Sequence, residues 1–350
     1  MKSWQFAEFG GPEKLTRLES ETPTPGAGEV RVRVAYCGVN PVDISTMRGR
    51  FANLPLPHTP GCEVAGMVDA VGPGVASPQV GTRVAVAFRR YCDRCYYCLR
   101  GREIDCSTYI TEPGLPILGV QTNGGFAEYV VIPARNAIPV PAGLSQAQAC
   151  AAALDGATAR HLVDRAGVRA GENVLVVGAT GGIGTYGVQF AARRGATVWA
   201  LARGAEAAER LRALGAAAVI DREQEDVNAR IRTLSDGRGV DVALDPLGAV
   251  TWPMSIAALA QGGRYATCGV LTGAQVTLDL GPFYNRQQQI IGSTGGSRGD
   301  LAETLAATAA GQVEGLIWRT YPLDEAPQAM AALSDSGRLG KILLEVGGEA

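Results

Sequence analysis

The sequence predicts an α/β protein with a β-rich first third, followed by a doubly wound parallel sheet. Before about residue 145, short Val-rich segments lie between Gly and Pro breakers, and helical periodicity is sparse. After that point, Ala-rich helical segments alternate with short apolar strands, a pattern typical of parallel strands covered by helices on both faces. With 350 residues, 46% of them hydrophobic, the chain can form a large core, so we expect two large domains.

The β-rich region begins at residues 29–34, where charged residues alternate with Val. Further strands are expected at 64–71 and 82–88, which are rich in β-branched residues. The strands of the parallel sheet are predicted at 174–177, 197–201, 218–220, 240–244, 264–267 and 289–292. An amphipathic helix is expected near 301–310, and a closing strand at 341–346 is expected to return to the first domain.

Charge and hydropathy exclude several classes of partner. The formal net charge of −2 gives no electrostatic reason to bind nucleic acid or an anionic membrane. No apolar run reaches the ~18 residues of a membrane span, and residues 1–15 lack the apolar centre of a signal peptide. We therefore expect a cytoplasmic protein.

A glycine-rich turn directly follows the first strand of the parallel sheet and precedes a helical stretch at 185–194. Small residues there allow a tight turn, close approach of a pyrophosphate to the first helical N–H groups, and packing of helix on strand. The strand–turn–helix context favours dinucleotide binding over a merely structural turn. The predicted cofactor-binding residues are Ala179, Thr180, Gly181, Gly182, Ile183 and Gly184.

The next strand ends without the acidic residue that would bind a ribose 2′-hydroxyl. Arg203 stands there instead and could pair with a 2′-phosphate, which favours NADPH over NADH. In the alternative interpretation, Arg203 is a solvated surface residue and Glu206 reaches the ribose.

Four of the eight cysteines, Cys92, Cys95, Cys98 and Cys106, lie close together on one short segment. Four thiolates suit a closed, tetrahedral Zn²⁺ site that is structural, because no position stays open for chemistry. Disulfides are the main alternative, but a protein without a secretion signal should keep its thiols reduced. Redox signalling through the cluster is a further alternative. The other cysteines, Cys37, Cys62, Cys150 and Cys268, show no metal-ligand spacing.

Together with the four-cysteine segment and the glycine-rich turn, the segments at 38–43 (GVNPVD), 61–66 (GCEVAG) and 340–343 (GKIL) resemble the medium-chain dehydrogenase/reductase superfamily over nearly the whole chain. The resemblance implies three parts. These are a GroES-like catalytic domain at 1–155 with a structural-zinc lobe near 90–107, a Rossmann domain at 156–292, and a C-terminal segment at 293–350 that completes the catalytic domain. It also implies an active site between the domains, and a homodimer or homotetramer joined through an edge strand of the Rossmann sheet.

The catalytic zinc of alcohol dehydrogenases in this superfamily is held by Cys, His and Cys, and the motif register places Asn40, Cys62 and Leu154 at those positions. Only Cys62 is a strong ligand there, so we expect no catalytic zinc. An improvised site would have to combine Cys62 with His58, Glu63 and Asp155.

Members without catalytic zinc resemble quinone oxidoreductases and enoyl reductases, whose early segment also reads Gly-Val-Asn-Pro. The hydroxyl that relays protons in many alcohol dehydrogenases is replaced here by Val42. Without a Lewis acid, the accessible reaction is hydride addition to an activated C=C bond or a quinone. The expected substrate is a small apolar electrophile. The apolar residues expected to line its pocket are Phe51, Leu54, Leu115, Pro116, Phe283 and Tyr284.

The resemblance also assigns roles at the active site. Asn40 is the expected hydrogen-bond donor to the developing oxyanion. Ser45 stands where several quinone reductases have Tyr, so the proton donor is open and water is plausible. Thr158 either touches the nicotinamide or caps a helix. Asp155 is a candidate general acid, while Asp43 and Glu63 match carboxylates that steady metal ligands in relatives. Backbone contacts to the nicotinamide are expected from Gly269, Val270 and Ser293.

Three functions are therefore compatible with the sequence. The leading hypothesis is an NADPH-dependent reductase of activated double bonds or quinones. The alternatives are a zinc-dependent alcohol dehydrogenase with unusual ligands, which would bind about two zinc ions per chain rather than about one, and a non-catalytic NADPH-binding protein.

Overall fold

The computed structural model describes residues 1–51, 54–108 and 117–349. The chain forms two compact units, one of Met1–Leu154 with Gly296–Ala350 and the other of Asp155–Gly295. Each unit has its own main sheet and its own hydrophobic core. Among the described residues, no helix is long and apolar enough to cross a lipid bilayer.

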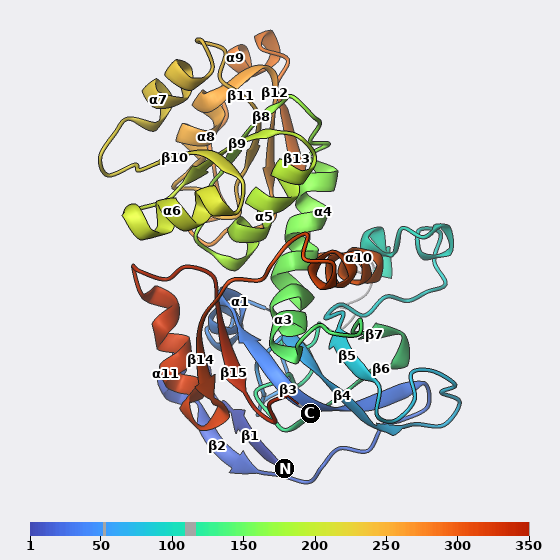
Figure 1. Ribbon diagram of the computed structural model, residues 1–350. Coiled ribbons are helices and arrows are strands. Elements are labelled where there is room, and N and C mark those ends of the chain that lie inside the picture. The colour runs from blue at the N-terminus through green and yellow to red at the C-terminus, as the bar shows by residue number, and fades with distance from the viewer. Residues whose placement is uncertain (52–53, 109–116, 350) are drawn as a thin grey trace. The chain divides into compact units, whose positions relative to one another are not determined.

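The first unit is built on a seven-stranded, mainly antiparallel sheet (Figure 1). In spatial order its strands are β14 (Ile317–Pro322), β15 (Lys341–Glu345), β3 (Glu29–Val39), β4 (Glu63–Val71), β5 (Arg83–Val86) and β7 (Ala137–Pro139), and β6 (Tyr129–Pro133) also pairs with β3. Strand β15 runs antiparallel to β3 with Ile342 opposite Val39, so the C-terminal segment contributes to the sheet of this unit. Strands β1 (Lys2–Gln5) and β2 (Thr16–Glu19) form a separate antiparallel pair.

Strand β3 shows why the sequence pattern predicts only part of its length. Val30, Val32 and Val34 are buried at alternate positions, as the pattern of 29–34 predicts. The strand continues to Val39 through residues that are buried at every position. A strand covered on both faces has no alternation of polar and apolar residues to reveal it.

The first unit also contains the short helices α1 (Pro41–Met47), α3 (Gln146–Ala151), α10 (Arg298–Ala309) and α11 (Ala326–Ala331). Single 3₁₀ turns are η1 (Pro12–Lys14), η2 (Cys98–Arg100), η3 (Glu103–Asp105), η4 (Ala134–Asn136), η6 (Leu323–Glu325) and η7 (Ala332–Ser334). Helix α1 is too short for periodicity to predict it, but its start carries local signals. Asn40 is the N-cap, Pro41 follows it, and the Asp43 carboxylate accepts the Asn40 N–H at 2.8 Å.

The second unit is a six-stranded sheet whose pairs are all parallel, as the alternation of strands and helices predicts. Its spatial order is β10 (Ala216–Ile220), β9 (Thr197–Leu201), β8 (Asn173–Val176), β11 (Val240–Leu244), β12 (Leu259–Thr267) and β13 (Gln289–Gly292). The order reverses between β8 and β11, as in doubly wound sheets, so right-handed crossovers place helices on both faces.

The helices of this unit are α4 (Ala157–Arg165), α5 (Gly182–Arg193), α6 (Ala205–Ala213), α7 (Val227–Leu234), α8 (Trp252–Ala258) and α9 (Leu280–Asn285). A π-helical segment, η5 (Ala152–Gly156), lies between α3 and α4 and contains the boundary between the two units. Such segments are rare and occur frequently at functional sites.

Candidate functional site

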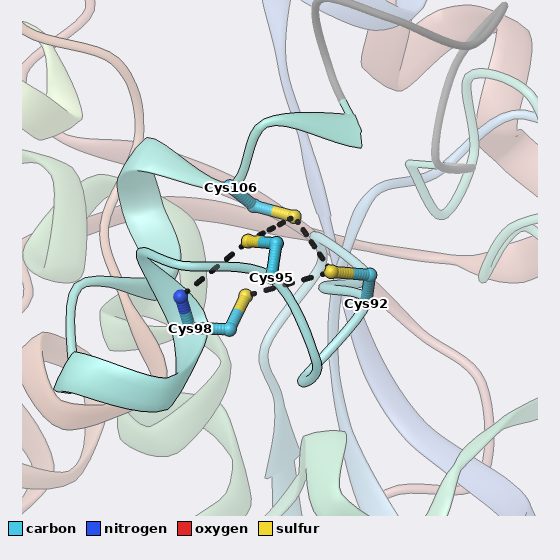
Figure 2. Close-up of side chains that lie close together, drawn as sticks. All are labelled: Cys92, Cys95, Cys98 and Cys106. Carbon is cyan, nitrogen blue, oxygen red and sulfur yellow. Dashed lines mark hydrogen bonds between the residues drawn. The ribbon is translucent and has the colours of Figure 1, made fainter.

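The four clustered cysteines lie on the segment around η2 and η3, and their sulfur atoms point toward one another (Figure 2). The Cys92 and Cys106 sulfurs are 3.5 Å apart, and the Cys92–Cys98 and Cys95–Cys106 distances are both 3.9 Å. A zinc ion with Zn–S bonds of ~2.3 Å separates its sulfur ligands by about 3.8 Å. The thiols are free rather than joined in disulfides, so the arrangement fits a four-sulfur zinc site.

Hydrogen bonds within the cluster favour thiolates at some of its positions. The Cys98 N–H donates to the Cys95 sulfur at 3.5 Å, and this bond, with others from Ser107, lowers the pKa of Cys95 to about 5. A hydrogen bond with the Thr108 side chain lowers the pKa of Cys92, whereas burial raises the pKa of Cys98. Thiolates are the form that binds zinc.

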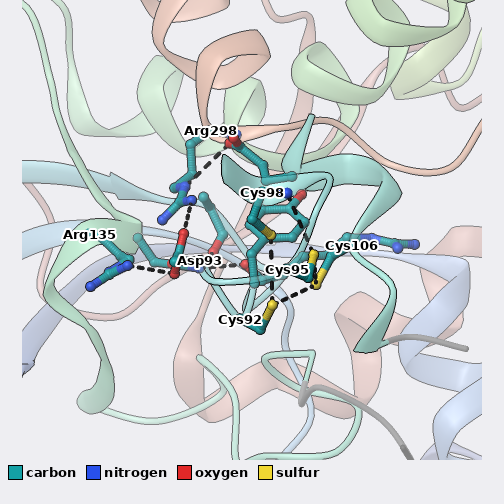
Figure 3. A network of polar contacts seen from close by, with 12 residues as sticks. Cys92, Asp93, Cys95, Cys98, Cys106, Arg135 and Arg298 are labelled. Atoms are coloured by element: carbon teal, nitrogen blue, oxygen red, sulfur yellow. Dashed lines mark hydrogen bonds and ion pairs between the residues drawn. The ribbon is translucent and has the colours of Figure 1, made fainter. Parts of the chain in front are cut away.

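One arginine anchors the cysteine segment to α10 (Figure 3). The Arg298 guanidinium lies 2.5 Å from an Asp93 carboxylate oxygen and 3.3 Å from a Glu103 oxygen. Asp93 also pairs with Arg135 at 2.6 Å, and the Tyr91 hydroxyl donates to the Gly296 carbonyl oxygen at 3.2 Å. Because Arg298 is only 17% exposed, these contacts hold the segment against the rest of the unit.

The glycine-rich turn lies between β8 and α5, as predicted, and Gly181 is the N-cap of α5. A Cβ atom added to Gly184 would lie 2.2 Å from the Gly178 carbonyl oxygen and 2.6 Å from the Ala179 Cα atom. Helix and turn therefore approach more closely than any side chain would permit. A helix that starts at such a tight glycine turn suits a pyrophosphate on its first N–H groups, and this role of the turn stays a prediction.

Two hydroxyls of the second unit suit a coenzyme. Among the described residues, the buried oxygens without a hydrogen-bond partner include Thr158 Oγ1 and Ser293 Oγ. Thr158 lies in the first turn of α4, but the N-cap is Gly156 and Thr158 provides no capping bond, which argues against the capping alternative. A buried hydroxyl without a hydrogen-bond partner costs free energy of folding, unless a bound ligand supplies the missing hydrogen bond.

The expected backbone contacts to the nicotinamide lie just beyond β12. Gly269 packs so closely on Pro246 that an added Cβ atom would lie 2.3 Å from the Pro246 carbonyl oxygen. The Thr267 hydroxyl donates to the Gly269 carbonyl oxygen at 3.0 Å, and Val270 is partly exposed. These residues therefore form a fixed turn at the carboxyl end of the strand.

Arg203 is not a solitary surface residue. Its guanidinium donates to the Glu223 carboxylate at 2.9 Å, and the two side chains are 45% and 55% exposed. The neighbouring Gly204 N–H donates to Asp221 at 3.3 Å. An exposed pair of this kind contributes at most about 1 kcal/mol, so a phosphate could compete with Glu223 for Arg203.

The residues at the expected catalytic-metal position form a buried network of their own. Lys341 Nζ lies 2.6 Å from Glu63 Oε2 and 2.6 Å from Asn40 Oδ1. The Asn40 amide group donates to Glu63 Oε2 at 3.0 Å and to the Gly38 carbonyl oxygen at 3.3 Å. Both N–H bonds of the Asn40 amide are thus used within the unit, so in this conformation Asn40 offers no unused donor to a substrate oxyanion.

Glu63 is the centre of this network. Its Oε1 atom accepts the N–H of Leu154 in η5 at 3.1 Å, and the Cys150 thiol donates to its carbonyl oxygen at 3.5 Å. A Cβ atom at Gly38 would lie 2.0 Å from Glu63 Oε2, so a side chain at this position would displace the Glu63 carboxylate. The motif register places Leu154 at a ligand position, but the side chain of leucine has no donor atom for a metal ion. Its backbone N–H donates to Glu63 instead.

Asp43 adds a second buried carboxylate. It accepts the N–H of Asn40 at 2.8 Å and of Gly61 at 3.1 Å. Burial raises the pKa of Asp43 to about 7, even though these bonds and Lys341 favour the ionised form. Asp43 thus fixes the start of α1 rather than facing solvent.

The remaining predicted catalytic residues do not converge on a metal. Among the residues that the structure describes, the four-cysteine cluster is the one group of three or more potential ligands close together. His58 is buried with Nε2 at 3.2 Å from the Gly119 carbonyl oxygen, and burial lowers its pKa. Cys62 is buried in the core of the first unit, whereas Asp155 belongs to the second.

Ser45 lies on α1, where its hydroxyl donates to the Pro41 carbonyl oxygen at 3.1 Å. Of the apolar residues proposed to suit the substrate, Phe51 and Leu54 are half-buried in the first unit, and Tyr284 is exposed in the second. Leu115 and Pro116 lie outside the described residues.

Lys341 is the residue of this site that sequence reasoning missed. Its segment, 340–343, contributes only to the resemblance, and a lone lysine before an apolar strand resembles a surface residue. Its rarity was the available signal, because the chain has only three lysines among 32 basic residues.

Two family models match this chain. Residues 26–142 match the alcohol dehydrogenase GroES-like domain, and residues 182–310 match the zinc-binding dehydrogenase model.

Similar proteins carry two different names. An NAD-dependent alcohol dehydrogenase of Saccharolobus solfataricus is 32% identical, covering 98% of this chain and 99% of that protein. A quinone oxidoreductase of Rattus norvegicus is 31% identical, covering 98% and 97%. A solved structure of the cobalt- and zinc-bound thermostable alcohol dehydrogenase from Pyrobaculum aerophilum aligns over 99% of both chains, with 38% identity and a TM-score of 0.90.

Proposed function

Since this chain belongs to the medium-chain dehydrogenase/reductase superfamily of oxidoreductases, we propose that it is an NADPH-dependent reductase of activated C=C bonds or quinones that works without a catalytic zinc ion. One observation carries this proposal. The ammonium of Lys341 lies 2.6 Å from both Asn40 and Glu63, so a cation of the chain itself already balances the carboxylate that bonds to Asn40 at an expected ligand position.

The donor set supports the same conclusion. A catalytic zinc needs three protein ligands with strong donor atoms. The register offers only Cys62, because Leu154 has no donor atom and the Asn40 carboxamide oxygen accepts the Lys341 ammonium. A site without a Lewis acid cannot readily activate an alcohol, so an already electron-poor acceptor is the better substrate.

In this proposal the second unit binds the coenzyme. The N–H groups at Gly182 and Ile183 receive the pyrophosphate, while the hydroxyls of Thr158 and Ser293 gain the partner that they lack. The chemistry that a bound coenzyme would supply is hydride transfer, to the β-carbon of an enone or to a quinone, which would leave an enolate or hydroquinone anion. Ser45 or water then delivers the proton, and Asn40 shapes this site through the network described above.

A zinc-dependent alcohol dehydrogenase is the second candidate. It is favoured by the names of several relatives and by the zinc-binding dehydrogenase model. Metal content separates the two functions. We expect about one zinc per chain, bound at the cysteine cluster, whereas about two would support the alcohol dehydrogenase.

A substrate panel tests the reaction. We expect purified protein to oxidise NADPH with small enones or quinones, and not to oxidise primary or secondary alcohols. Alcohol turnover together with a second zinc would overturn the proposal. Binding of NADPH without turnover of enones, quinones, acyl-CoA esters or aldehydes would instead indicate a non-catalytic binding protein.

The coenzyme preference rests on Arg203. We expect Arg203→Ala to weaken NADPH binding about tenfold, since one charge-assisted pair is worth ~1.4 kcal/mol, and to leave NADH binding unchanged. Glu223→Gln is the matched control, because removing the competing carboxylate should strengthen NADPH binding. Fluorescence titration with both coenzymes measures the effect. Equal losses of affinity for NADPH and NADH would contradict the assignment of Arg203 to the 2′-phosphate. This test matters because two of the relatives are named as NAD-dependent enzymes.

For the homodimer or homotetramer, we propose the β13 edge as the joining surface. Strand β13 is an edge strand of the parallel sheet, and Ile290 on it is 44% exposed. Leu280 and Tyr284 of the preceding helix α9 are also exposed. Exposed edge strands and apolar patches favour association between chains. Ile290→Asp should shift the mass in sedimentation experiments toward the monomer, and an unchanged mass would exclude this edge.

A further inference from the structure

Lysine is nearly absent from this chain, and one of the few lysines is buried. The three lysines are Lys2, Lys14 and Lys341, among 32 basic residues. Lys2 is exposed and the side chain of Lys14 is 39% exposed, whereas that of Lys341 is 3% exposed. Arginine is therefore the usual cation of this chain, yet lysine forms the most deeply buried ion pair among the residues that the structure describes.

The geometry around Lys341 explains why arginine does not serve there. The ammonium approaches the Asn40 and Glu63 oxygens at 2.6 Å each, and these two side chains bond to each other at 3.0 Å. A compact ammonium can direct its hydrogens to two converging acceptors, while a planar guanidinium presents a wide, fixed fork. The two converging oxygens thus suit a small cation of high charge density.

We propose that Lys341 is a positioning residue of the active site, whose ammonium balances the buried Glu63 carboxylate and holds Asn40 in place. This inference rests on the proposed function without catalytic zinc. The residues present do not fit such a zinc ion, since they leave Cys62 as the one strong ligand of the register.

The effect of Lys341 reaches the reaction through α1. Asn40 is the N-cap of α1, and its N–H is bound by Asp43 in the first turn. The same helix carries Ser45, the candidate proton donor. When Lys341 fixes the Asn40 carboxamide, it fixes the start of α1 and with it the position of Ser45.

The first experiment observes the ammonium directly and needs no substrate. With only three lysines, ¹⁵N-lysine labelling gives a side-chain spectrum that single variants can assign. We expect one slowly exchanging NH₃⁺ signal at neutral pH, absent in Lys341→Met and present in the exposed control Lys14→Met. If no protected NH₃⁺ signal is seen, Lys341 is not held as proposed and the inference fails.

The second experiment separates positioning from stability. We expect Lys341→Met to lower kcat about 10- to 100-fold, as loss of a group that orients site residues does, with coenzyme affinity unchanged within about twofold. Lys341→Arg should lower kcat as well, since the charge remains but the geometry does not. Lys14→Met should retain the wild-type kcat.

The double variant Lys341→Met/Glu63→Gln separates a positioning role of Lys341 from a merely structural one. It also replaces Lys341→Met as the test if that single variant does not fold. It removes both charges of the Lys341–Glu63 pair and leaves Asp43 as the buried carboxyl group, so we expect Tm to recover in part. We expect kcat to stay low, and amide hydrogen exchange in residues 40–47 to be faster than in the wild type. Recovery of kcat together with Tm would show a merely structural pair and overturn the inference. If the wild type reduces neither enones nor quinones, the proposed function fails, whereas the NH₃⁺ signal and the exchange in α1 still test Lys341.

Discussion

The first unit contains two clusters of electron-rich atoms, the four cysteines and the surroundings of Glu63, and they differ in the cation that suits them. The four cysteines lie within one segment of the chain, with three sulfur pairs at 3.5–3.9 Å and all four sulfurs within 4.8 Å of one another, so their thiolates would suit a cation from outside. Around Glu63, the atoms come from the N-cap of α1, from β4 and from β15, and the cation is the side chain of Lys341. The difference teaches that one unit can gather four cysteines suited to a metal ion at one position and place a cation of its own beside a buried carboxylate at another.

The two centres should also respond differently to damage. A zinc ion bound by the cysteine cluster would be dissociable, so we expect the integrity of the cluster to vary with chelators and metal supply. The Asn40–Glu63–Lys341 network depends only on the fold and should be insensitive to chelation. The following experiments break or sharpen this contrast.

The largest effect should come from a ligand of the cysteine cluster. Cys106→Ser removes the buried ligand of the four, and zinc content should fall from about one to about zero per chain, because structural zinc binds with ~10–16 kcal/mol. Metal analysis after gel filtration measures the result. Cys268→Ser, outside the cluster, should keep its zinc, and retention of zinc by Cys106→Ser would contradict the assigned ligand set.

Breaking the Asn40–Glu63–Lys341 network should have a smaller effect than the loss of a cysteine ligand, but it should still lower the stability of the fold strongly. Glu63→Gln leaves the Lys341 ammonium buried without its carboxylate, which should lower the free energy of unfolding by about 3–5 kcal/mol. Thermal and urea unfolding measure this loss, and zinc content should stay at about one per chain. A loss of zinc in Glu63→Gln would show that the network holds a metal after all.

A smaller effect is expected where the cysteine segment is anchored. Arg298→Gln removes the charged bonds to Asp93 and Glu103 and should cost about 1.5–3 kcal/mol. Zinc should remain bound but leave faster in the presence of a chelator. The exposed pair of Arg102 with Asp105 offers the control, since Arg102→Gln should change neither stability nor zinc release. Equal effects of the two variants would argue against a special anchoring role for Arg298.

The smallest effect concerns the pH dependence of stability. Burial lowers the pKa of His58 in the folded chain below its ordinary value of 6.5, so the folded state favours the neutral ring. His58 therefore contributes stability that is fully present above about pH 6.5 and is lost as pH falls through the folded-state pKa. His58→Gln should flatten the stability profile in that acidic window without changing zinc content. A change in zinc content would identify His58 as a ligand instead.

Local spacing explains which parts of the site the sequence predicts. The four cysteines and the glycine-rich turn each lie within a short stretch, so their composition and order already indicate their geometry. The parallel sheet of the second unit is predicted for a similar reason, because each strand adjoins its helix. The proposed domain boundaries and catalytic roles stay predictions.

The sequence by itself determined the α/β class, the fit of one segment to zinc and the turn that suits a dinucleotide, since all of these depend on near neighbours in the chain. Only the tertiary structure decided the surroundings of Asn40. The sheet pairs β15 with β3, and this long-range pairing brings Lys341 to Asn40 and Glu63. A buried charge is tolerated only beside its partner, and when that partner is distant in sequence, only the completed fold can show which residue it is.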